Sequence, residues 1–409
     1  MKQYKLLFIG SHVIQYYGPL FRMLGAHPRV DFRVLYCTRL GAETYLDHDL
    51  GVRLKWDVPL LEGYQFRFLK NYTPRDRGFF RHVNPGIIPA LWHERPTAVW
   101  VSGWGTLSMW ITYVACWFMR IPYFVYGDNT FVVERSGPLG WIRRQILQWL
   151  FRNAGGFLLQ GIMNGDYFAH YGADRRKFFL VPYAVDNERF HRDSRMIADE
   201  RRRRRKALGI DPDRVVLLFA GKLIERKNPV HLLQAVQRMR TRDKVAVLYL
   251  GDGRARSDLE QYARDNGMQH VHFTGFVNQS EMPPYYALAD IFVLPSSLDP
   301  RGTVTNEAMA CELPVVISNM VGIYGEGDIV RDGDNGFVYQ VGDNDRLATL
   351  LDRLVEDPEL RRRMGERSWE IIRRWSFDRD VEGLLQALAF VSDGIPAAPA
   401  LSAESAAHG

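Results

Sequence analysis

A buried strand, a polar loop and a helix follow one another in the stretch IFVLPSSLDPRGTVTNEAMA, residues 291–310. The strand is predicted to end at Pro295, the loop carries Asp299, and the helix begins near Gly302. Backbone N–H groups at such a helix start favour an anion, and Gly302 would let a phosphate approach closely. Glu307 is expected one turn further on, where a carboxylate can accept hydrogen bonds from ribose hydroxyls. An Asx turn at Asp299 and a surface position for Glu307 are the structural alternatives.

The same alternation of short apolar runs and helical patterns extends through the chain. Runs of Val, Ile, Leu and Phe without polar alternation indicate strands that are buried on both faces of a parallel sheet. The predicted strands are Leu6–Gly10, Phe32–Cys37, Phe66–Leu69, Val99–Trp104, Tyr123–Tyr126, Phe157–Gln160 and Phe178–Val181 in a first sheet, and Val215–Gly221, Val245–Gly251, Val271–Thr274, Ile291–Pro295, Pro314–Ser318 and Gly336–Tyr339 in a second. We therefore expect an α/β protein of two doubly wound, Rossmann-like domains, with ligands at the carboxyl ends of the strands.

Polar segments mark the expected domain boundaries. We predict an N-terminal Rossmann-like domain at 1–190, a charged linker at 191–212 and a C-terminal Rossmann-like domain at 213–374. A last helix at 375–391 is expected to return to the first domain. The tail at 392–409 is rich in Ala, Pro and Ser and is predicted to be disordered.

Composition excludes several classes of protein. Of 409 residues, 46% are hydrophobic and 24% charged, values that are ordinary for globular chains and exclude disordered and collagen-like sequences. The three cysteines are far apart, so neither a disulfide framework nor a zinc site is expected. Residues 96–119 carry no charge, but Ser and Gly in the middle favour a βαβ unit over a membrane span. The first strand lacks a GxGxxG motif, which disfavours a nicotinamide or flavin dehydrogenase.

The charge is distributed unevenly along the chain. Residues 1–206 hold 31 basic and 17 acidic residues, whereas residues 207–409 hold 22 and 30. Six of the basic residues form the run 201–206, which a solvated helix face would explain. The remaining excess of basic residues in the first half of the chain suggests an anionic surface or an anionic acceptor as partner. Residues 140–152 interleave Trp, Ile, Leu and Arg at helical spacing, as expected either of a helix on an anionic membrane or of a domain helix with an apolar core face.

Two lysines follow the first strand of the second predicted sheet, in FAGKLIERKNP, residues 219–229. Lys222 and Lys227 should lie at the same sheet edge as the Asp299 loop, where two ammonium groups can neutralise a diphosphate without a metal. Gly251, after the next strand along the chain, should lie at this edge too. A solvated basic turn paired with Glu225 is the alternative.

Taken together, these segments resemble the retaining, nucleotide-sugar-dependent glycosyltransferases of the GT-B fold, glycosyltransferase family 4 (glycosyl transferases group 1). The signature of that family is two glutamates separated by seven residues, in a stretch that ends in EAMA and precedes a strand like PVV. Here it corresponds to Asp299, Glu307 and the residues up to Val316, with Asp299 in place of the first glutamate. A Gly-Arg-Leu…Lys-Gly segment of the family corresponds to 221–228, with Lys222 in place of arginine. The resemblance covers roughly residues 1–390.

The resemblance implies two domains that face each other across a cleft, with a donor site in the second. It implies that Lys222, Lys227 and Asp299 are catalytic: the lysines would hold the donor diphosphate and Asp299 the transferred sugar, while Glu307 would bind the ribose. Further donor contacts would come from Gly221 and Gly251, from Gly302, Thr303 and Val304 at the helix start, and from Phe276 and Val277 at the base. Transfer would retain the anomeric configuration, and neither a metal nor another cofactor would be needed.

In the first domain, His12, Asp128 and Glu134 are candidates for roles on the acceptor side. We expect an enzyme that moves a hexose-type sugar from a nucleotide sugar to a saccharide or lipid-linked acceptor in bacterial surface glycan biosynthesis, as in lipopolysaccharide or exopolysaccharide. It is expected in the cytoplasm, with peripheral contact at the inner face of the plasma membrane. The alternatives are an inactive nucleotide-sugar-binding scaffold and a GT-B epimerase or phosphorylase. No nucleic-acid partner is expected, because no recognised binding motif is present.

Overall fold

The computed structural model describes residues 3–47, 49–75, 77–131 and 137–394. The chain divides into two compact units. Unit 1 consists of Met1–Tyr45, Val58–Ala184 and Phe377–Gly409, and unit 2 consists of Leu46–Asp57 and Val185–Ser376. The chain therefore passes from one unit to the other four times.

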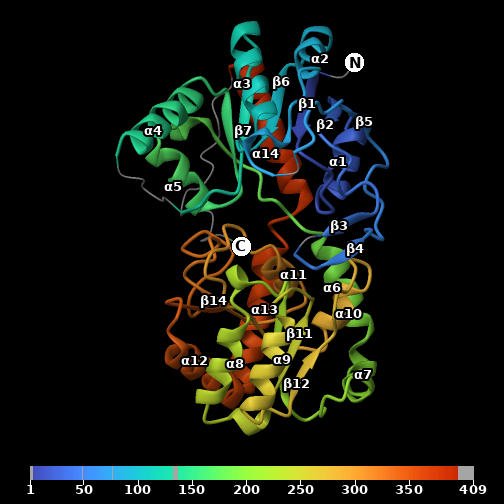
Figure 1. The fold of residues 1–409 in the computed structure, drawn as a ribbon, viewed down its shortest axis with the longest axis vertical. Coiled ribbons are helices and arrows are strands. Elements are labelled where there is room, and N and C mark those ends of the chain that lie inside the picture. The colour runs from blue at the N-terminus through green and yellow to red at the C-terminus, as the bar shows by residue number, and fades with distance from the viewer. Residues whose placement is uncertain (1–2, 48, 76, 132–136, 395–409) are drawn as a thin grey trace. The chain divides into compact units, whose positions relative to one another are not determined.

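Unit 1 is built on a seven-stranded parallel sheet with the strand order β5-β2-β1-β6-β7-β8-β9 (Figure 1). Its strands are β1 (Tyr4–Gly10), β2 (Val30–Tyr36), β5 (Gln65–Phe68), β6 (Ala98–Ser102), β7 (Tyr123–Tyr126), β8 (Gly156–Leu159) and β9 (Phe178–Leu180). All seven strands were predicted from the sequence. The central strands β1, β6 and β7 are almost wholly buried, because helices cover both faces of the sheet.

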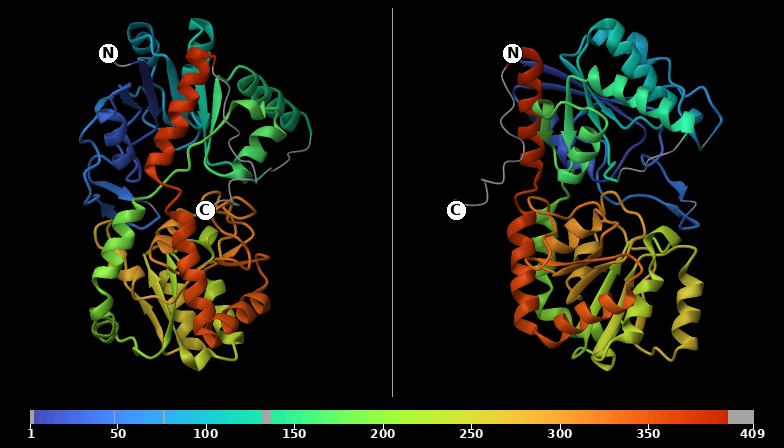
Figure 2. Two further views of the ribbon diagram at one scale, coloured as in Figure 1. Left: turned by 180° about the vertical axis from the view of Figure 1, so that it is seen from behind. Right: turned by 90° about the vertical axis from the view of Figure 1, so that its left-hand side faces the viewer.

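The two faces of this sheet carry separate apolar cores. On one face, buried side chains of α1 (Tyr17–Ala26) and α14 (Phe377–Asp393) pack against the strands; Figure 2 shows α14 running along the sheet. The other face is covered by α2 (Ile87–Glu94), α3 (Leu107–Met119), α4 (Gly137–Arg152) and α5 (Ile162–His170). Short 3-10 turns lie at η1 (Phe79–Arg81) and η2 (Arg175–Lys177). The uncharged stretch 96–119 forms β6 and α3, as predicted, and no helix in the described part of the chain combines the length and apolarity that a membrane span requires.

Unit 2 contains a six-stranded parallel sheet with the strand order β12-β11-β10-β13-β14-β15. Its strands are β10 (Val215–Ala220), β11 (Val245–Leu250), β12 (Val271–Phe273), β13 (Ile291–Leu294), β14 (Val315–Ser318) and β15 (Gly336–Tyr339), again as predicted. Chain order reverses between β10 and β13, which are neighbours in the sheet. This reversal is the switch point at which doubly wound sheets bind their ligands.

The helices of unit 2 are α6 (Asn187–Met196), α7 (Arg201–Ala207), α8 (Val230–Arg238), α9 (Arg256–Asp265), α10 (Met282–Tyr286), α11 (Val304–Ala310), α12 (Asn344–Glu356) and α13 (Pro358–Ile372), with 3-10 turns η3 (Ala198–Glu200), η4 (Glu225–Lys227) and η5 (Arg242–Lys244). A two-stranded ribbon of β3 (Tyr45–Asp47) and β4 (Val52–Leu54) was not predicted. Most of it belongs to unit 2 although its sequence lies among the strands of unit 1.

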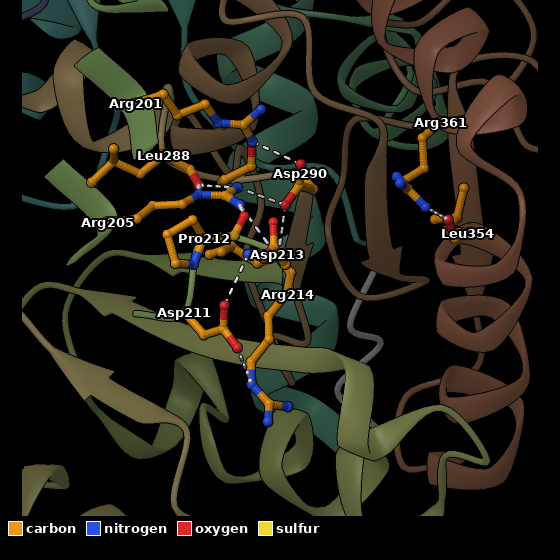
Figure 3. Close-up of polar contacts among 12 residues, drawn as sticks. Arg201, Arg205, Asp211, Pro212, Asp213, Arg214, Leu288, Asp290, Leu354 and Arg361 are labelled. Atoms are coloured by element: carbon orange, nitrogen blue, oxygen red, sulfur yellow. Dashed lines mark hydrogen bonds and ion pairs between the residues drawn. The ribbon is translucent and has the colours of Figure 1, made fainter. Parts of the chain in front are cut away.

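The boundaries differ from the expected ones because the predicted linker is packed structure. The first crossing after β9 lies between Ala184 and Val185, and α6 and α7 are part of unit 2. Arg205, in the middle of the basic run, is buried rather than solvated and donates hydrogen bonds to the carbonyl oxygens of Leu288, Pro212 and Arg214 and to Asp290 (Figure 3). Helix α14 lies in unit 1 and extends to Asp393, two residues into the predicted tail 392–409, of which residues 395–409 lie outside the described residues.

The docking of α14 on unit 1 gives a stability prediction. A Cβ added at Gly383 would lie 1.9 Å from the carbonyl oxygen of Leu180, which is a backbone atom at the end of β9. Although alanine is ordinarily the better helix former, we expect Gly383→Ala to destabilise unit 1 by about 1–3 kcal/mol, because the helix must move off the sheet. The melting temperature should fall by about 5 °C.

Gly105→Ala is the matched control, because a Cβ at Gly105 would meet no atom within 4 Å. Thermal unfolding followed by circular dichroism measures both variants. A melting temperature of Gly383→Ala that equals that of Gly105→Ala would show that α14 does not pack on β9 as described.

Candidate active site

The loops that follow the strands of unit 2 are joined to one another at the carboxyl edge of the sheet. The backbone N–H of Gly221, after β10, donates to the carbonyl of Leu250 at the end of β11 (2.9 Å). On the other side, the N–H of Ser297, after β13, donates to the carbonyl of Arg226 (2.9 Å), and the Arg226 guanidinium donates to the carbonyl of Leu298 (2.8 Å). The segments that carry Lys222, Lys227 and Asp299 therefore lie together at the switch point of the sheet.

Asp299 is the most extensively bonded of the predicted residues. Its side chain is 8% exposed; Oδ1 accepts a hydrogen bond from the N–H of Gly302 (2.9 Å), and Oδ2 forms an ion pair with the Nζ of Lys227. Its backbone bonds to Met320 and Gly322, after β14. The structure thus confirms the local turn at Asp299 and adds an ion pair with Lys227. Lys227 is not a solvated lysine paired with Glu225.

Glu307 lies in α11 and is fully buried, so the alternative of a surface helix residue is wrong. Its Oε2 accepts a hydrogen bond from the hydroxyl of Tyr286, at the end of α10, at 2.7 Å. A buried carboxylate costs free energy unless it is hydrogen-bonded, and Tyr286 supplies such a bond. Tyr286 could not be predicted as a partner of Glu307, because nothing in the order of residues links α10 to α11.

The start of α11 differs in one respect from the phosphate site predicted there, namely in the part played by Gly302. Gly302 is buried with a φ of +52°, and a Cβ there would lie 2.7 Å from Val321, so glycine is required by backbone conformation and packing. Its N–H donates to Asp299 and is not available to a phosphate. Thr303 and Val304 are partly buried at the first turn of α11, and phosphate contacts by these two residues remain a prediction.

Lys222 has two acidic partners that the sequence analysis did not identify. Its Nζ lies 3.0 and 2.9 Å from the two carboxylate oxygens of Asp47 and 3.2 Å from Asp49. Asp47 is nearly buried, and its Oδ1 also accepts the backbone N–H groups of Asp49 and Leu50. Burial alone would raise the pKa of Asp47, but the hydrogen bonds from Lys222 and Leu50 hold that pKa below its usual range. The residue expected to bind a diphosphate is thus occupied by carboxylates of the chain itself.

The segment after β12, where the base contacts were expected, also meets the β3–β4 ribbon and the residues that follow it. The ring of Phe276, which is exposed, lies 6.4 Å from that of Trp56. Asn278 donates to the carbonyl of Lys55 (2.7 Å), and the backbone and hydroxyl of Ser280 donate to the carboxylate of Asp57. Val277, between these contacts, is partly buried. Residues 46–57 therefore touch both places where the donor was expected to bind.

The glycines predicted at this edge have a structural reason to be glycine. Gly221 and Gly251 have φ values of +131° and +144°, which side chains rarely adopt. A Cβ on Gly251 would lie 2.1 Å from the carbonyl oxygen of Gly221. At Gly251 the two strand ends approach each other too closely for a residue with a side chain. Contacts of Gly221 and Gly251 with a donor remain a prediction.

In unit 1, His12 directly follows β1 and Asp128 follows β7, both at the carboxyl edge of the sheet, whereas Glu134 lies outside the described residues. The Nδ1 of His12 lies 2.8 Å from the Ser11 hydroxyl. Burial, together with the charge of Arg81, lowers the pKa of His12 to about 4. The same causes lower the pKa of His82 to about 4. Both imidazoles are therefore neutral at neutral pH and can act as hydrogen-bonding groups rather than as charges.

His82 was missed because its burial depends on contacts with residues far away in the sequence. Its side chain is 6% exposed, and its Nδ1 has no hydrogen-bond partner among the described residues. Among all the residues that the structure describes, no group of three or more His, Cys, Asp or Glu side chains is placed to hold a metal ion.

Sequence comparison relates part of the chain to a known family. Residues 200–370 match glycosyl transferases group 1. The lipopolysaccharide core biosynthesis glycosyltransferase LpsE of Rhizobium meliloti is 34% identical over 187 residues, 45% of this chain and 53% of that protein. A GDP-mannose-dependent α-(1-6)-phosphatidylinositol monomannoside mannosyltransferase of Mycolicibacterium smegmatis is 32% identical over 207 residues, 48% and 51% of the two chains. The chain spans about half the length of these curated relatives.

Structural comparison extends over nearly the whole chain. The crystal structure of Anabaena HepE in complex with UDP and glucose aligns with 94% of this chain and 99% of its own, with a TM-score of 0.70 at 17% identity. At this identity the likeness shows the fold, which is GT-B as the sequence motifs predicted. The chain therefore has the GT-B fold, and its residues 200–370 match glycosyl transferases group 1.

Proposed function

We propose that the protein is a retaining glycosyltransferase that moves a hexose-type sugar from a nucleotide sugar to a saccharide or lipid-linked acceptor in bacterial surface glycan biosynthesis. The observation that carries this proposal is the grouping of Lys222, Lys227 and Asp299 on linked loops at the switch point of unit 2, with Glu307 buried in the adjoining helix α11. The named functions of the relatives support the same reaction class: LpsE acts in lipopolysaccharide core biosynthesis.

Each group of the proposed site has a distinct task. Lys222 and Lys227 neutralise the diphosphate of the donor and stabilise the charge that grows on it as the glycosidic bond breaks. Asp299, held by Gly302 and Lys227, positions the transferred sugar, and Glu307 binds the ribose hydroxyls. Phe276 and Val277 contact the base. Since the two lysines carry the compensating charge, we propose that no metal is needed.

Retention follows if the acceptor hydroxyl attacks from the face that the diphosphate leaves. The departing phosphate oxygen is then close enough to take the proton of the acceptor hydroxyl, so no separate carboxylate base is required. His12 and Asp128 of unit 1 are proposed to bind acceptor hydroxyls. A neutral imidazole at His12 suits that role, because it offers hydrogen bonds without repelling or trapping a charged acceptor.

The proposal is tested by donor binding and hydrolysis across UDP-, GDP-, dTDP- and ADP-sugars. We expect one nucleoside diphosphate to bind and to be released slowly from its sugar, in the presence and absence of a chelator. Glu307→Gln should weaken nucleotide binding at least about tenfold, because it removes the carboxylate proposed to hold the ribose. Glu281→Gln, at an exposed glutamate near the start of α10, is the matched control and should bind normally.

The other outcomes separate the alternatives. Tight binding without turnover, even with crude lipid acceptors, would identify a scaffold. Conversion of the donor into an epimeric sugar, or phosphate-dependent cleavage of a glycan, would identify an epimerase or a phosphorylase. Failure to bind any of the four nucleotides would overturn the proposed donor site.

The ion pair between Asp47 and Lys222 yields a second prediction. A donor diphosphate that binds Lys222 must displace the carboxylate of Asp47. Asp47→Asn keeps a side-chain oxygen for the N–H groups of Asp49 and Leu50 but removes the competing charge. We therefore expect this variant to bind the nucleoside diphosphate about threefold to tenfold more tightly, with unchanged affinity for the uncharged nucleoside.

Asp57→Asn is the control for that experiment, since Asp57 lies ten residues further along and contacts Ser280 rather than Lys222. Titration calorimetry with the diphosphate and the nucleoside measures both variants. Weaker binding of the diphosphate to Asp47→Asn would mean that Asp47 helps to bind the donor instead of competing with it.

We further propose peripheral contact with an anionic membrane through an aromatic surface of unit 1. This surface consists of Trp117 and Phe118 of α3 and Leu139, Trp141, Ile142 and Ile146 of α4, all exposed. Helix α4 has features that support both of the alternatives that its sequence suggested. Its carboxyl-terminal residues, such as Leu150, are buried in the core, whereas its first two turns expose Leu139 and Trp141 to 80% and 64%. Arg144 is exposed among these apolar residues and can meet anionic headgroups, whereas the guanidinium of Arg143 donates to the hydroxyls of Tyr167 and Tyr171.

Co-sedimentation with vesicles tests the membrane contact. We expect the protein to pellet with vesicles rich in phosphatidylglycerol at low salt, and less so with phosphatidylcholine alone or at high salt. Phe118→Ser combined with Trp141→Ser should abolish pelleting, whereas Tyr72→Ser, at another exposed aromatic residue of unit 1, should not. If the protein stays in the supernatant under all conditions, the proposed membrane contact is wrong.

A further inference from the structure

A pocket lined by arginines lies at the amino edge of the unit 2 sheet. Its volume is about 380 Å³, and its charged lining residues are Arg195, Arg201, Asp290, Glu312, Arg361 and Arg362. Asp290 immediately precedes β13, whereas Asp299 and the proposed donor site follow that strand. The arginine pocket and the donor site are therefore at opposite edges of one sheet.

The single negative charge of Asp290 does not balance the positive charges of the arginines around it (Figure 3). Its Oδ1 lies 2.7 Å from Arg201, and its Oδ2 accepts hydrogen bonds from Arg205 and from the N–H of Val216, both at 2.7 Å. One negative charge thus faces two guanidinium groups, which leaves one positive charge in excess. The Nε of Arg201 is buried and has no hydrogen-bond partner among the described residues. A further acceptor is therefore missing on this side of the pocket.

Arg361, on α13, contributes a second positive charge. Its guanidinium donates to the carbonyl oxygens of Leu354 and Val355, which are neutral, and no carboxylate of the described residues lies within ion-pair distance of it. Burial, only partly offset by the more distant Asp290 and Asp357, lowers the pKa of Arg361. This direction means that the surroundings of Arg361 disfavour its charge as they stand.

The remaining charges at the rim largely cancel. Arg195 lies 3.4 Å from Glu312, and Arg362 pairs with Glu359 and Glu366. The excess charge is therefore concentrated at Arg201, Arg205 and Arg361. Guanidinium groups present planar sets of N–H donors that match the oxygens of a phosphate.

We propose that the arginine pocket binds a small soluble phosphomonoester. A phosphate dianion would supply the two missing negative charges and acceptors for the N–H groups of Arg201 and Arg361. The pocket volume lies at the lower end of the range for small-molecule sites, so the ligand is the size of a sugar phosphate. This binding site is separate from the proposed donor site and does not depend on its chemistry.

The test is calorimetric titration of the full chain with glucose 6-phosphate, inorganic phosphate and glucose. We expect both phosphates to bind and glucose not to bind. Arg361→Gln should weaken phosphate binding at least tenfold, whereas Arg363→Gln, two residues along the same helix and exposed, should not. Ala198→Asp places a carboxylate on the pocket wall at an exposed alanine and should abolish binding without disturbing the core. This second variant keeps the test valid if Arg361→Gln does not fold.

Lys222→Gln separates the two sites, because it alters only the proposed donor site. Phosphate binding that is lost in Lys222→Gln but kept in Ala198→Asp would overturn the proposal by locating the anion at the donor site. Equal binding by wild type and Ala198→Asp overturns it as well. Binding of vesicles that contain phosphatidic acid, in competition with glucose 6-phosphate, would assign the pocket to a lipid headgroup and contradict a soluble ligand.

Discussion

Asp299 connects three strand ends of unit 2 through four bonds, and the geometry of the proposed donor site depends on it. One carboxylate oxygen fixes Gly302 and with it the start of α11, and the other holds Lys227 on the loop after β10. Its backbone is joined to the turn after β14. An aspartate can reach these partners from a tight turn, and the shorter side chain relative to glutamate is compatible with all of them. The departure from the family pattern is therefore accommodated by the structure around it.

Much of the fold was predictable because parallel sheets require long apolar runs. Most strands of the seven-stranded and six-stranded sheets correspond to such a run, and the central strands are buried on both faces, whereas the edge strands β5 and β12 are more exposed. The β3–β4 ribbon escaped prediction because each of its strands is buried only at the last residue, so no apolar run marks them. The linker was mispredicted for a related reason: a run of arginines looks solvated, whereas Arg205 is buried through hydrogen bonds to carbonyl groups that sequence order does not reveal.

The candidate site was predictable in its strand-end residues and not in their partners. The positions of Lys222, Lys227 and Asp299 follow from strand order alone, because the carboxyl ends of parallel strands share an edge. Tyr286, Asp47 and His82 act through contacts between segments that are distant along the chain, and no local pattern marks them. Gly302 was expected at the helix start, where a phosphate could approach it, but the hydrogen bond from its N–H to Asp299 could be found only from the structure.

The return of α14 to unit 1 bears on how this protein is made. One face of the unit 1 sheet is covered by Leu384, Leu388 and neighbouring side chains of α14, which follow β9 by about two hundred residues. A nascent chain emerging from the ribosome therefore carries unit 1 with an uncovered apolar face throughout the synthesis of unit 2. Unit 2 needs only residues 46–57 from earlier in the chain and can assemble as it emerges. The amino-terminal unit is thus the last to be completed, and until then its exposed sheet face is a natural substrate for chaperones.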